Sequence, residues 1–156
     1  MWEYGLLPAG QLEDNEEWRF WYAVNGYAYQ GLRYFAMALS DSQPEAGRRY
    51  AREAEAYRQD IRAAALRSMA AAPVAPLADG TWVPTLPSRT HMHGRDLGWI
   101  RNILYGALAL VDTGVFAPDE KITEWILQDH EENLFMAPWS FSVAERDWFS
   151  RANSSS

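Results

Sequence analysis

Hydrophobic and polar positions in the first half of the chain are spaced as in two helices. Over residues 15–39, apolar side chains recur every three or four positions, at Phe20, Val24, Tyr27, Gly31, Tyr34, Phe35 and Ala38. Over 44–71, one apolar stripe is flanked by charged residues. Because further aromatic residues lie on its other faces, the first segment is apolar all round, which is typical of a buried helix. The pattern therefore predicts a buried helix over 15–39 and an amphipathic helix over 44–71.

The second half of the chain repeats this order. Apolar residues cover most of the circumference of a helix expected over 96–112, and a narrow apolar stripe runs through one expected over 118–134. Short turns follow the two buried helices, whereas long loops, 1–15 and 72–95, precede them. Within the second loop, residues 81–83 are expected to form a short extended piece. Long and short connections therefore alternate along the chain.

Alternating buried and amphipathic helices indicate consecutive antiparallel helical hairpins of an α/α toroid, with inner helices covered on both sides. We therefore expect an all-α fold, in which one domain over 1–156 forms part of an (α/α)6 toroid and ends in a polar tail, 150–156. An ordinary helical bundle is the alternative, but it does not require the connections to alternate. In a toroid both long loops open at the N-termini of inner helices, where the helix dipole favours polar or anionic ligand atoms.

Composition and charge narrow the classes of partner. The 156 residues are 48% hydrophobic, include eight Trp and carry a net charge of −7, which argues against nucleic acid or an anionic membrane as a partner. The absence of Cys excludes disulfides, thiolate metal sites and Cys nucleophiles. No apolar run is long enough for a bilayer span, and the N-terminus lacks a signal-peptide pattern. The simplest expectation is a soluble, cytoplasmic protein, unless an upstream signal is missing from a partial chain.

Aromatic side chains near the loop end of the predicted toroid are candidates for binding sugars, because an aromatic ring offers a flat apolar face and Trp and Tyr add a polar edge. The candidates are Trp18, Trp21, Tyr22, Tyr27, Trp82 and Trp99. Tyr22, Trp82 and Trp99 are favoured because they are nearest to that end. The alternative is packing in the core, which we expect for most of this group.

A polar cluster precedes the third predicted helix, at Arg89, His91, His93, Arg95 and Asp96. Such a rim can hydrogen-bond sugar hydroxyls or clamp a carboxylate, as a uronic-acid ligand would require. The alternative is that Asp96 caps the helix while the arginines balance local acids. His91 and His93 are not expected to bind a metal, because no third ligand is near them in the sequence. We predict neither a metal nor a cofactor.

Several segments carry a resemblance to a known family. They are GLLP before an acidic cluster, the aromatic helix that ends YQGLRYFAMAL, and the later EAxxYRxDI, DGTWVP and YGAL. Together they resemble the six-hairpin glycosidase superfamily, the (α/α)6-barrel group that includes glucoamylase-like hydrolases. The resemblance extends from Gly5 to Trp139, but members carry six hairpins, whereas this chain has room for two and the start of a third. It implies a carbohydrate ligand and hydrolysis of glycosidic bonds.

One local match concerns the general acid. Glucoamylases carry a Leu-Trp-Glu-Glu-Val-Asn-Gly segment whose first Glu is that acid, and residues 20–26 of this chain read Phe-Trp-Tyr-Ala-Val-Asn-Gly. The matching positions are Trp21, Val24, Asn25 and Gly26. Tyr22 and Ala23 replace both acids, so in this register the family's general acid is absent. Asn25 remains a substrate-binding candidate by resemblance.

The remaining catalytic candidates are Asp14, Glu16 and Glu17, which lie just before Trp18. Inverting glycosidases need two carboxyls roughly 6.5–9.5 Å apart, one of them protonated. The alternative is that these acids only stabilise a helix N-terminus. The partner base, by resemblance, belongs to a later hairpin that this chain lacks. We therefore expect the isolated chain to be inactive.

Two functions remain in competition. The chain is either a segment of a carbohydrate-active hydrolase or a non-catalytic helical module that binds a glycan or a protein. A toroid with terpenoid-cyclising chemistry ranks last, because no Asp-rich metal motif is present in the sequence. Two hairpins leave a helix face of the buried type open at each edge, so we also expect self-association or a missing remainder of the barrel.

Overall fold

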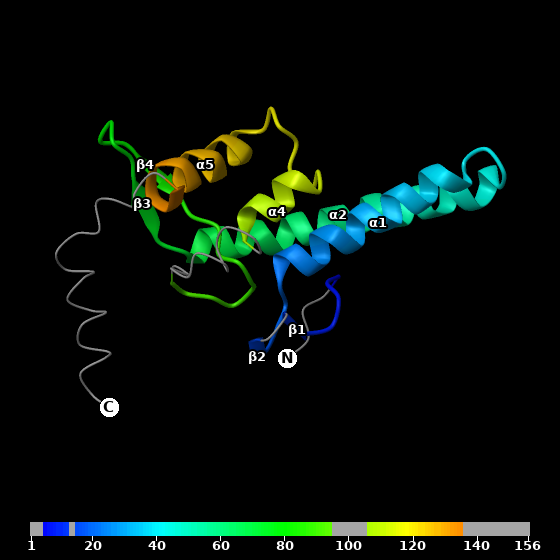
Figure 1. Cartoon of the computed structure of the whole chain (residues 1–156), viewed down its shortest axis with the longest axis horizontal. Helices are drawn as coiled ribbons and strands as arrows, with labels where there is room; N and C mark the ends of the chain where they lie inside the picture. The colour runs from blue at the N-terminus through cyan, green and yellow to red at the C-terminus, as the bar shows by residue number, and fades with distance from the viewer. Residues whose placement is uncertain (1–4, 13–14, 95–105, 136–156) are drawn as a thin grey trace.

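The computed structural model describes residues 5–12, 15–94 and 106–135 (Figure 1). Of these residues, 57% are helical and 12% lie in strands of two small antiparallel sheets. The prediction of an all-α fold that forms part of an (α/α)6 toroid is therefore wrong. The helices are too few for such a toroid, and both long loops contribute strands.

The first sheet replaces the start of the first predicted helix. β1 (Gly10–Leu12) pairs antiparallel with β2 (Asn15–Arg19), with Gly10 opposite Arg19 and Leu12 opposite Asn15. The helix expected from residue 15 begins only at Tyr22, as α1 (Tyr22–Leu39). Polar and aromatic residues alternate from Glu17 to Phe20, which is the period of a strand rather than of a helix. Glu16 and Glu17 therefore belong to a β-strand and do not begin a helix.

A long helical hairpin dominates the rest of the fold. α2 (Pro44–Ala71) spans the residues expected for the second helix and has Pro44 in its first turn, where the missing N–H costs nothing. Its apolar stripe is buried at Ala54, Ile61, Ala65 and Met69. In Figure 1 the distal ends of α1 and α2 extend as an arm beyond the rest of the chain. The other elements gather at the opposite end of the hairpin.

The second sheet and two shorter helices complete that end. β3 (Val74–Pro76) pairs antiparallel with β4 (Trp82–Pro84), which confirms an extended piece in the second loop. α4 (Ala107–Asp112) is the described part of the helix expected over 96–112. It is followed by Gly114 in the left-handed region, with φ of 77°. α5 (Lys121–Asp129) continues into a π-helical turn, η1 (His130–Phe135), where one helix was expected over 118–134.

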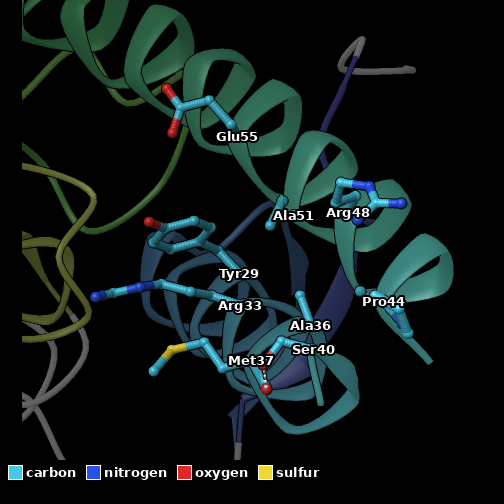
Figure 2. A pocket seen from close by; sticks show the side chains of 11 residues that line it. Tyr29, Arg33, Ala36, Met37, Ser40, Pro44, Arg48, Ala51 and Glu55 are labelled. Carbon is cyan, nitrogen blue, oxygen red and sulfur yellow. Dashed lines mark hydrogen bonds between the residues drawn. The ribbon is translucent and has the colours of Figure 1, made fainter. Parts of the chain in front are cut away.

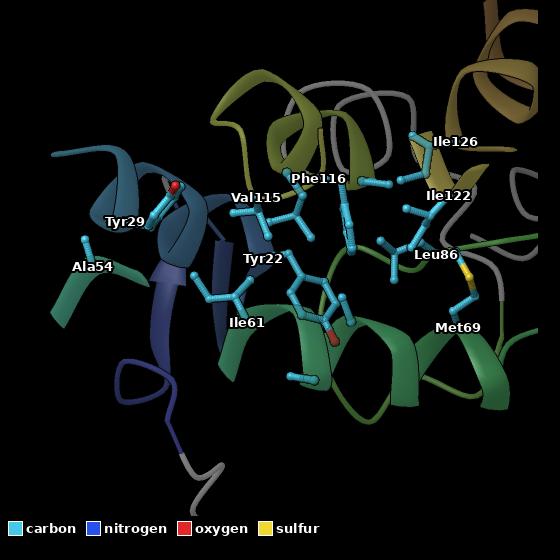
Figure 3. Packing of buried hydrophobic residues seen from close by; sticks show 14 residues of the cluster. Tyr22, Tyr29, Ala54, Ile61, Met69, Leu86, Val115, Phe116, Ile122 and Ile126 are labelled. Carbon is cyan, nitrogen blue, oxygen red and sulfur yellow. The ribbon is translucent and has the colours of Figure 1, made fainter. Parts of the chain in front are cut away.

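One hydrophobic cluster joins α1, α2, α4 and α5 (Figure 3). Its fully covered side chains include Tyr22, Ile61, Leu110, Phe116 and Ile126. Figure 3 shows the Tyr22 ring reaching toward α2, where its hydroxyl lies 2.6 Å from Ser68 Oγ. The cluster therefore fixes the N-terminal end of α1, and with it the hairpin that precedes this helix.

The outward face of α1 differs from its prediction. Tyr22, Asn25, Tyr29 and Ala36 are buried, but the stripe expected in the core is exposed at Val24, Tyr27, Gly31, Tyr34, Phe35 and Ala38. Periodicity alone cannot choose between two apolar faces, and contacts with α2 and α4 make the choice in this fold. Within the described ranges, no helix is long and apolar enough to cross a membrane.

Candidate functional site

A pocket of about 480 Å³ lies between the β1–β2 hairpin and the segment 89–93. We call it the hairpin pocket, and its walls are formed by Ala9, Trp18, Arg19, Phe20, Arg89, Thr90, His91, Met92 and His93. Three residues predicted as ligand contacts, Trp18, Arg89 and His91, meet in it although the first is far from the others in the sequence. The fold thus unites the aromatic and the polar candidates at one place.

Backbone hydrogen bonds bring the two walls together. Tyr22 N–H donates to Ser88 O over 3.0 Å, and Thr90 N–H donates to Phe20 O over 3.2 Å. Trp21 and Arg89 form an antiparallel bridge between these two bonds. The segment 88–90 therefore runs beside the chain that leads into α1, and it carries Arg89 to the hairpin.

Arg89 is held in place by a carboxylate and an indole. Its Nη2 lies 3.7 Å from Glu17 Oε2, and its Cζ lies 5.2 Å from the centroid of the Trp21 ring. Its side chain is only 15% exposed. A guanidinium stacked on an aromatic ring is attracted by the ring quadrupole and loses little freedom when it binds a ligand. Arg89 is therefore an oriented donor at the wall of the pocket.

Glu17 serves this arrangement as a counter-ion. Besides Arg89, its Oε2 lies 3.9 Å from Arg19 Nε. Glu17 does not line the hairpin pocket, and none of the described residues that do line it is a carboxylate. Of the three acids proposed for catalysis, Glu17 is thus engaged with guanidinium groups. The Asp14 position lies outside the described residues, and for Glu16 only the backbone position in β2 is described.

Thr90 offers a buried hydroxyl to the pocket. It is 5% exposed, and its Oγ1 has no hydrogen-bond partner among the described residues. Thr90 also lines a neighbouring cavity of about 180 Å³, on the side of Arg67 and Ser68. A buried polar atom without a partner costs free energy, so a water or ligand hydroxyl that reaches it is favoured. No feature of the sequence marked this residue.

The exposed tryptophans occupy two different places. Trp18 and Trp82 are each 63% exposed, but only Trp18 lines the hairpin pocket. Trp82 lies in β4, in the second sheet. Arg19 and Phe20 also line the hairpin pocket, although neither was predicted as a pocket residue. Alternation along this segment indicates a strand, in which successive side chains point to opposite faces, so it does not identify them as neighbours in one site.

Three predicted ligand contacts are structural instead. Trp21 is buried, and its Nε1–H donates to Gly10 O over 3.0 Å, which ties the hairpin to α1. Tyr22 lies in the hydrophobic cluster. Asn25 is buried and donates from Nδ2 to Trp21 O over 2.7 Å. These side chains cannot contact a sugar in this fold, because each is covered by other parts of the chain.

The segment matched to the glucoamylase acids is also interior. Tyr22 and Ala23, which stand at the two acid positions, are both buried at the start of α1. Arg95, Asp96 and Trp99 lie outside the described residues. The part of the chain that is described contains no group of three His, Asp or Glu side chains placed to hold a metal ion.

A second pocket lies along the arm, between α1 and α2 (Figure 2). It encloses about 540 Å³. Figure 2 shows Tyr29, Arg33 and Met37 on the α1 side and Arg48 with Glu55 on the α2 side. Opposite charges share this groove, and no predicted ligand contact lines it. The hairpin pocket is the better candidate because it combines an exposed aromatic ring with an oriented cation.

Comparison with known proteins assigns no family. The chain matches no protein-family model, no curated protein and no solved structure. The resemblance to six-hairpin glycosidases, and the hydrolysis that it implies, therefore stay predictions. The geometry of the hairpin pocket is the remaining guide to function.

Proposed function

We propose that the chain is a glycan-binding module of a carbohydrate-active protein and that it takes a negatively charged sugar in the hairpin pocket. The observation that supports this most directly is the exposed ring of Trp18 beside Arg19, Arg89, His91 and His93. This combination matches an acidic sugar, which has an apolar C–H face on its ring and a carboxylate at its edge.

The aromatic wall suits the apolar face of a sugar ring. Pyranose rings present C–H groups on one face and hydroxyls at the rim. A flat indole can cover the first while polar groups bind the second. Trp18 is 63% exposed, so its ring is open to such a ligand. Thr90 Oγ1 adds a buried partner for one hydroxyl.

The cationic wall favours a carboxylate on that sugar. Two guanidinium groups and two imidazoles line the pocket, although the whole chain carries a net charge of −7. Guanidinium groups bind carboxylates through two parallel charge-assisted hydrogen bonds. The orientation of Arg89 over Trp21 lowers the entropy that such a contact costs. A uronic acid is therefore favoured over a neutral sugar.

Binding is better supported than hydrolysis. Hydrolysis by paired carboxylates needs two such groups around the scissile bond. The described walls of the hairpin pocket provide none, and Glu17 beside it is engaged with Arg89 and Arg19. The module therefore supplies affinity for a glycan rather than a general acid.

Calorimetric titration with a uronic-acid trisaccharide and with its methyl ester tests the proposal. We expect the acid to bind at least tenfold more tightly than the ester, since tenfold corresponds to about 1.4 kcal/mol. Trp18→Ala should weaken binding of both ligands by roughly tenfold or more, because it removes the stacking surface. Trp82→Ala removes an equally exposed Trp outside the pocket and should leave the affinity unchanged.

Arg19→Gln tests the contribution of the positive charge to binding separately from that of the Trp18 ring. It should reduce the preference for the acid over the ester while the ester still binds. No binding of either ligand to the wild-type chain would overturn the proposal. Equal losses in Trp18→Ala and Trp82→Ala would overturn it as well, because they would place the ligand elsewhere.

A further inference from the structure

The outward face of α1 is apolar along most of the helix. At about 100° per residue, Val24, Tyr27, Gly31, Tyr34, Phe35 and Ala38 lie on the side opposite to the buried residues, and we call them the α1 stripe. Its four largest members are between 37% and 55% exposed. α4 contacts the other side of the helix, and the distal half of the stripe lies on the arm that projects in Figure 1.

This face lacks the charges that a solvated helix carries. The 18 residues of α1 include one charged side chain, Arg33, which is not part of the stripe. α2, by contrast, carries arginines and glutamates along its exposed surface. A helix face that is directed to water is normally polar. The stripe is thus built for contact with another apolar surface.

We propose that two copies of the chain associate through their α1 stripes, with the helices antiparallel and crossing at Gly31. A two-fold axis at Gly31 places Tyr27 of one copy opposite Phe35 of the other, and Val24 opposite Ala38. The stripe is therefore complementary to itself, as a two-fold interface requires. No atom lies within 4 Å of a Cβ built on Gly31, so the two backbones can approach closely.

The charges and the area fit a weak dimer. α1 contains no carboxylate, so it brings no pair of like-charged acids into this contact. The three aromatic rings of the stripe are about half exposed, and each can bury roughly 150–250 Å² when fully covered. With their flanking side chains, two copies cover on the order of 1,000 Å², the lower limit for a specific interface. We expect a dissociation constant in the micromolar range.

Sedimentation of the full chain over a range of concentrations from low to high micromolar tests this proposal. The wild type should shift from its 17.8 kDa monomer mass to twice that value. Tyr34→Glu should raise the dissociation constant at least tenfold, because it buries a carboxylate at the contact. Leu66→Glu, which places the same charge at a similarly exposed apolar residue of α2, should dimerise as the wild type does.

Gly31→Leu distinguishes a specific helix crossing at Gly31 from non-specific association of apolar surfaces. It favours helix formation and enlarges the apolar face, yet it prevents close approach at the proposed crossing. We expect it to weaken the dimer, with unchanged circular dichroism as the check of folding. A dimer strengthened by Gly31→Leu, or indifferent to Tyr34→Glu, would overturn the proposal. A monomer at every concentration would also overturn it.

Discussion

Asn25 joins three segments of the chain through one buried amide. Its Oδ1 accepts from Leu7 N–H over 2.9 Å and from the Tyr57 hydroxyl over 2.7 Å, while its Nδ2 donates to Trp21 O. Burial also raises the pKa of Tyr57, so its hydroxyl remains a donor at neutral pH. The amide thus connects the N-terminal segment, α1 and α2.

Asn25→Ala should destabilise the fold by about 2–3 kcal/mol, because it leaves buried donors without an acceptor. Tyr57→Phe, which removes one of the same hydrogen bonds, should cost only about 1 kcal/mol. Urea unfolding followed by circular dichroism measures both. An Asn25→Ala variant as stable as the wild type would contradict this role.

Glu120 provides a pH-dependent tie between α2 and the start of α5. The bidentate hydrogen bonds from Arg62, at 2.8 and 2.6 Å, hold the pKa of its carboxyl below the usual value. A carboxyl whose pKa is lower in the folded state than in the unfolded state stabilises the fold at pH values above its unfolded-state pKa. That contribution is lost as the pH falls through the folded pKa.

Glu120→Gln should therefore cost about 1–2 kcal/mol at pH 7, and the difference from the wild type should shrink toward pH 3. Glu124→Gln is the control, since its exposed pair with Lys121 should contribute less than about 0.5 kcal/mol. Urea midpoints at both pH values report the result. A difference that grows on acidification would contradict a lowered pKa of Glu120 in the folded chain.

At the level of single residues, the sequence predicts which side chains suit a ligand, but not whether the fold leaves them exposed. Trp18, Arg89 and His91 were predicted as ligand contacts and do line one pocket. Asn25 and Tyr22 have side chains equally suited to a ligand, but they are buried by contacts with distant segments. Burial of a polar side chain depends on such long-range partners, which the residue type does not reveal.

Among the elements, α1 packs closely against α4 at Gly26. A Cβ on Gly26 would lie 2.8 Å from Thr113 Oγ1 and 3.3 Å from Leu110 Cδ2. That hydroxyl is itself held, because it donates to Ala109 O over 2.6 Å. The close approach of the two helices therefore needs a residue without a side chain.

Gly26→Ala should destabilise the chain by about 1–3 kcal/mol, although alanine is the better helix former. Gly31→Ala in the same helix meets no atom within 4 Å and should stabilise the monomer by up to about 1 kcal/mol. Thermal unfolding at a concentration that keeps the chain monomeric compares them. Changes of the same sign in both variants would contradict the packing of α1 on α4.

Elements with strong local signals were predictable. α2 has a proline in its first turn and one apolar stripe, and it forms over the expected residues. The β1–β2 hairpin was missed because its acids also suit a helix N-terminus. It is held by the hydrogen bond from the Trp21 indole to Gly10 O and by the pairing of segment 88–90 with residues 20–22. These contacts join residues that are not neighbours in the sequence.

At the scale of the whole molecule, the helical pattern of the sequence predicts the α1–α2 hairpin but not the sheets and short helices that pack against it. Buried and amphipathic helices alternate in a toroid, yet the same alternation arises where one long hairpin packs on shorter helices. The two small sheets have strands of only three to five residues, too short for their period to outweigh the helical pattern that follows them. The ligand candidates meet because segment 88–90 pairs with the chain before α1, and only the folded structure reveals this pairing.

Amide chemical shifts of the isotope-labelled chain report directly whether an acidic sugar occupies the hairpin pocket. During titration with a uronic-acid trisaccharide, shifts should concentrate at Trp18–Phe20 and Arg89–His93, including the Trp18 indole N–H. The methyl ester should cause smaller shifts at the same residues. Shifts confined to the groove between α1 and α2, or none at saturating ligand, would contradict binding of an acidic sugar in the hairpin pocket.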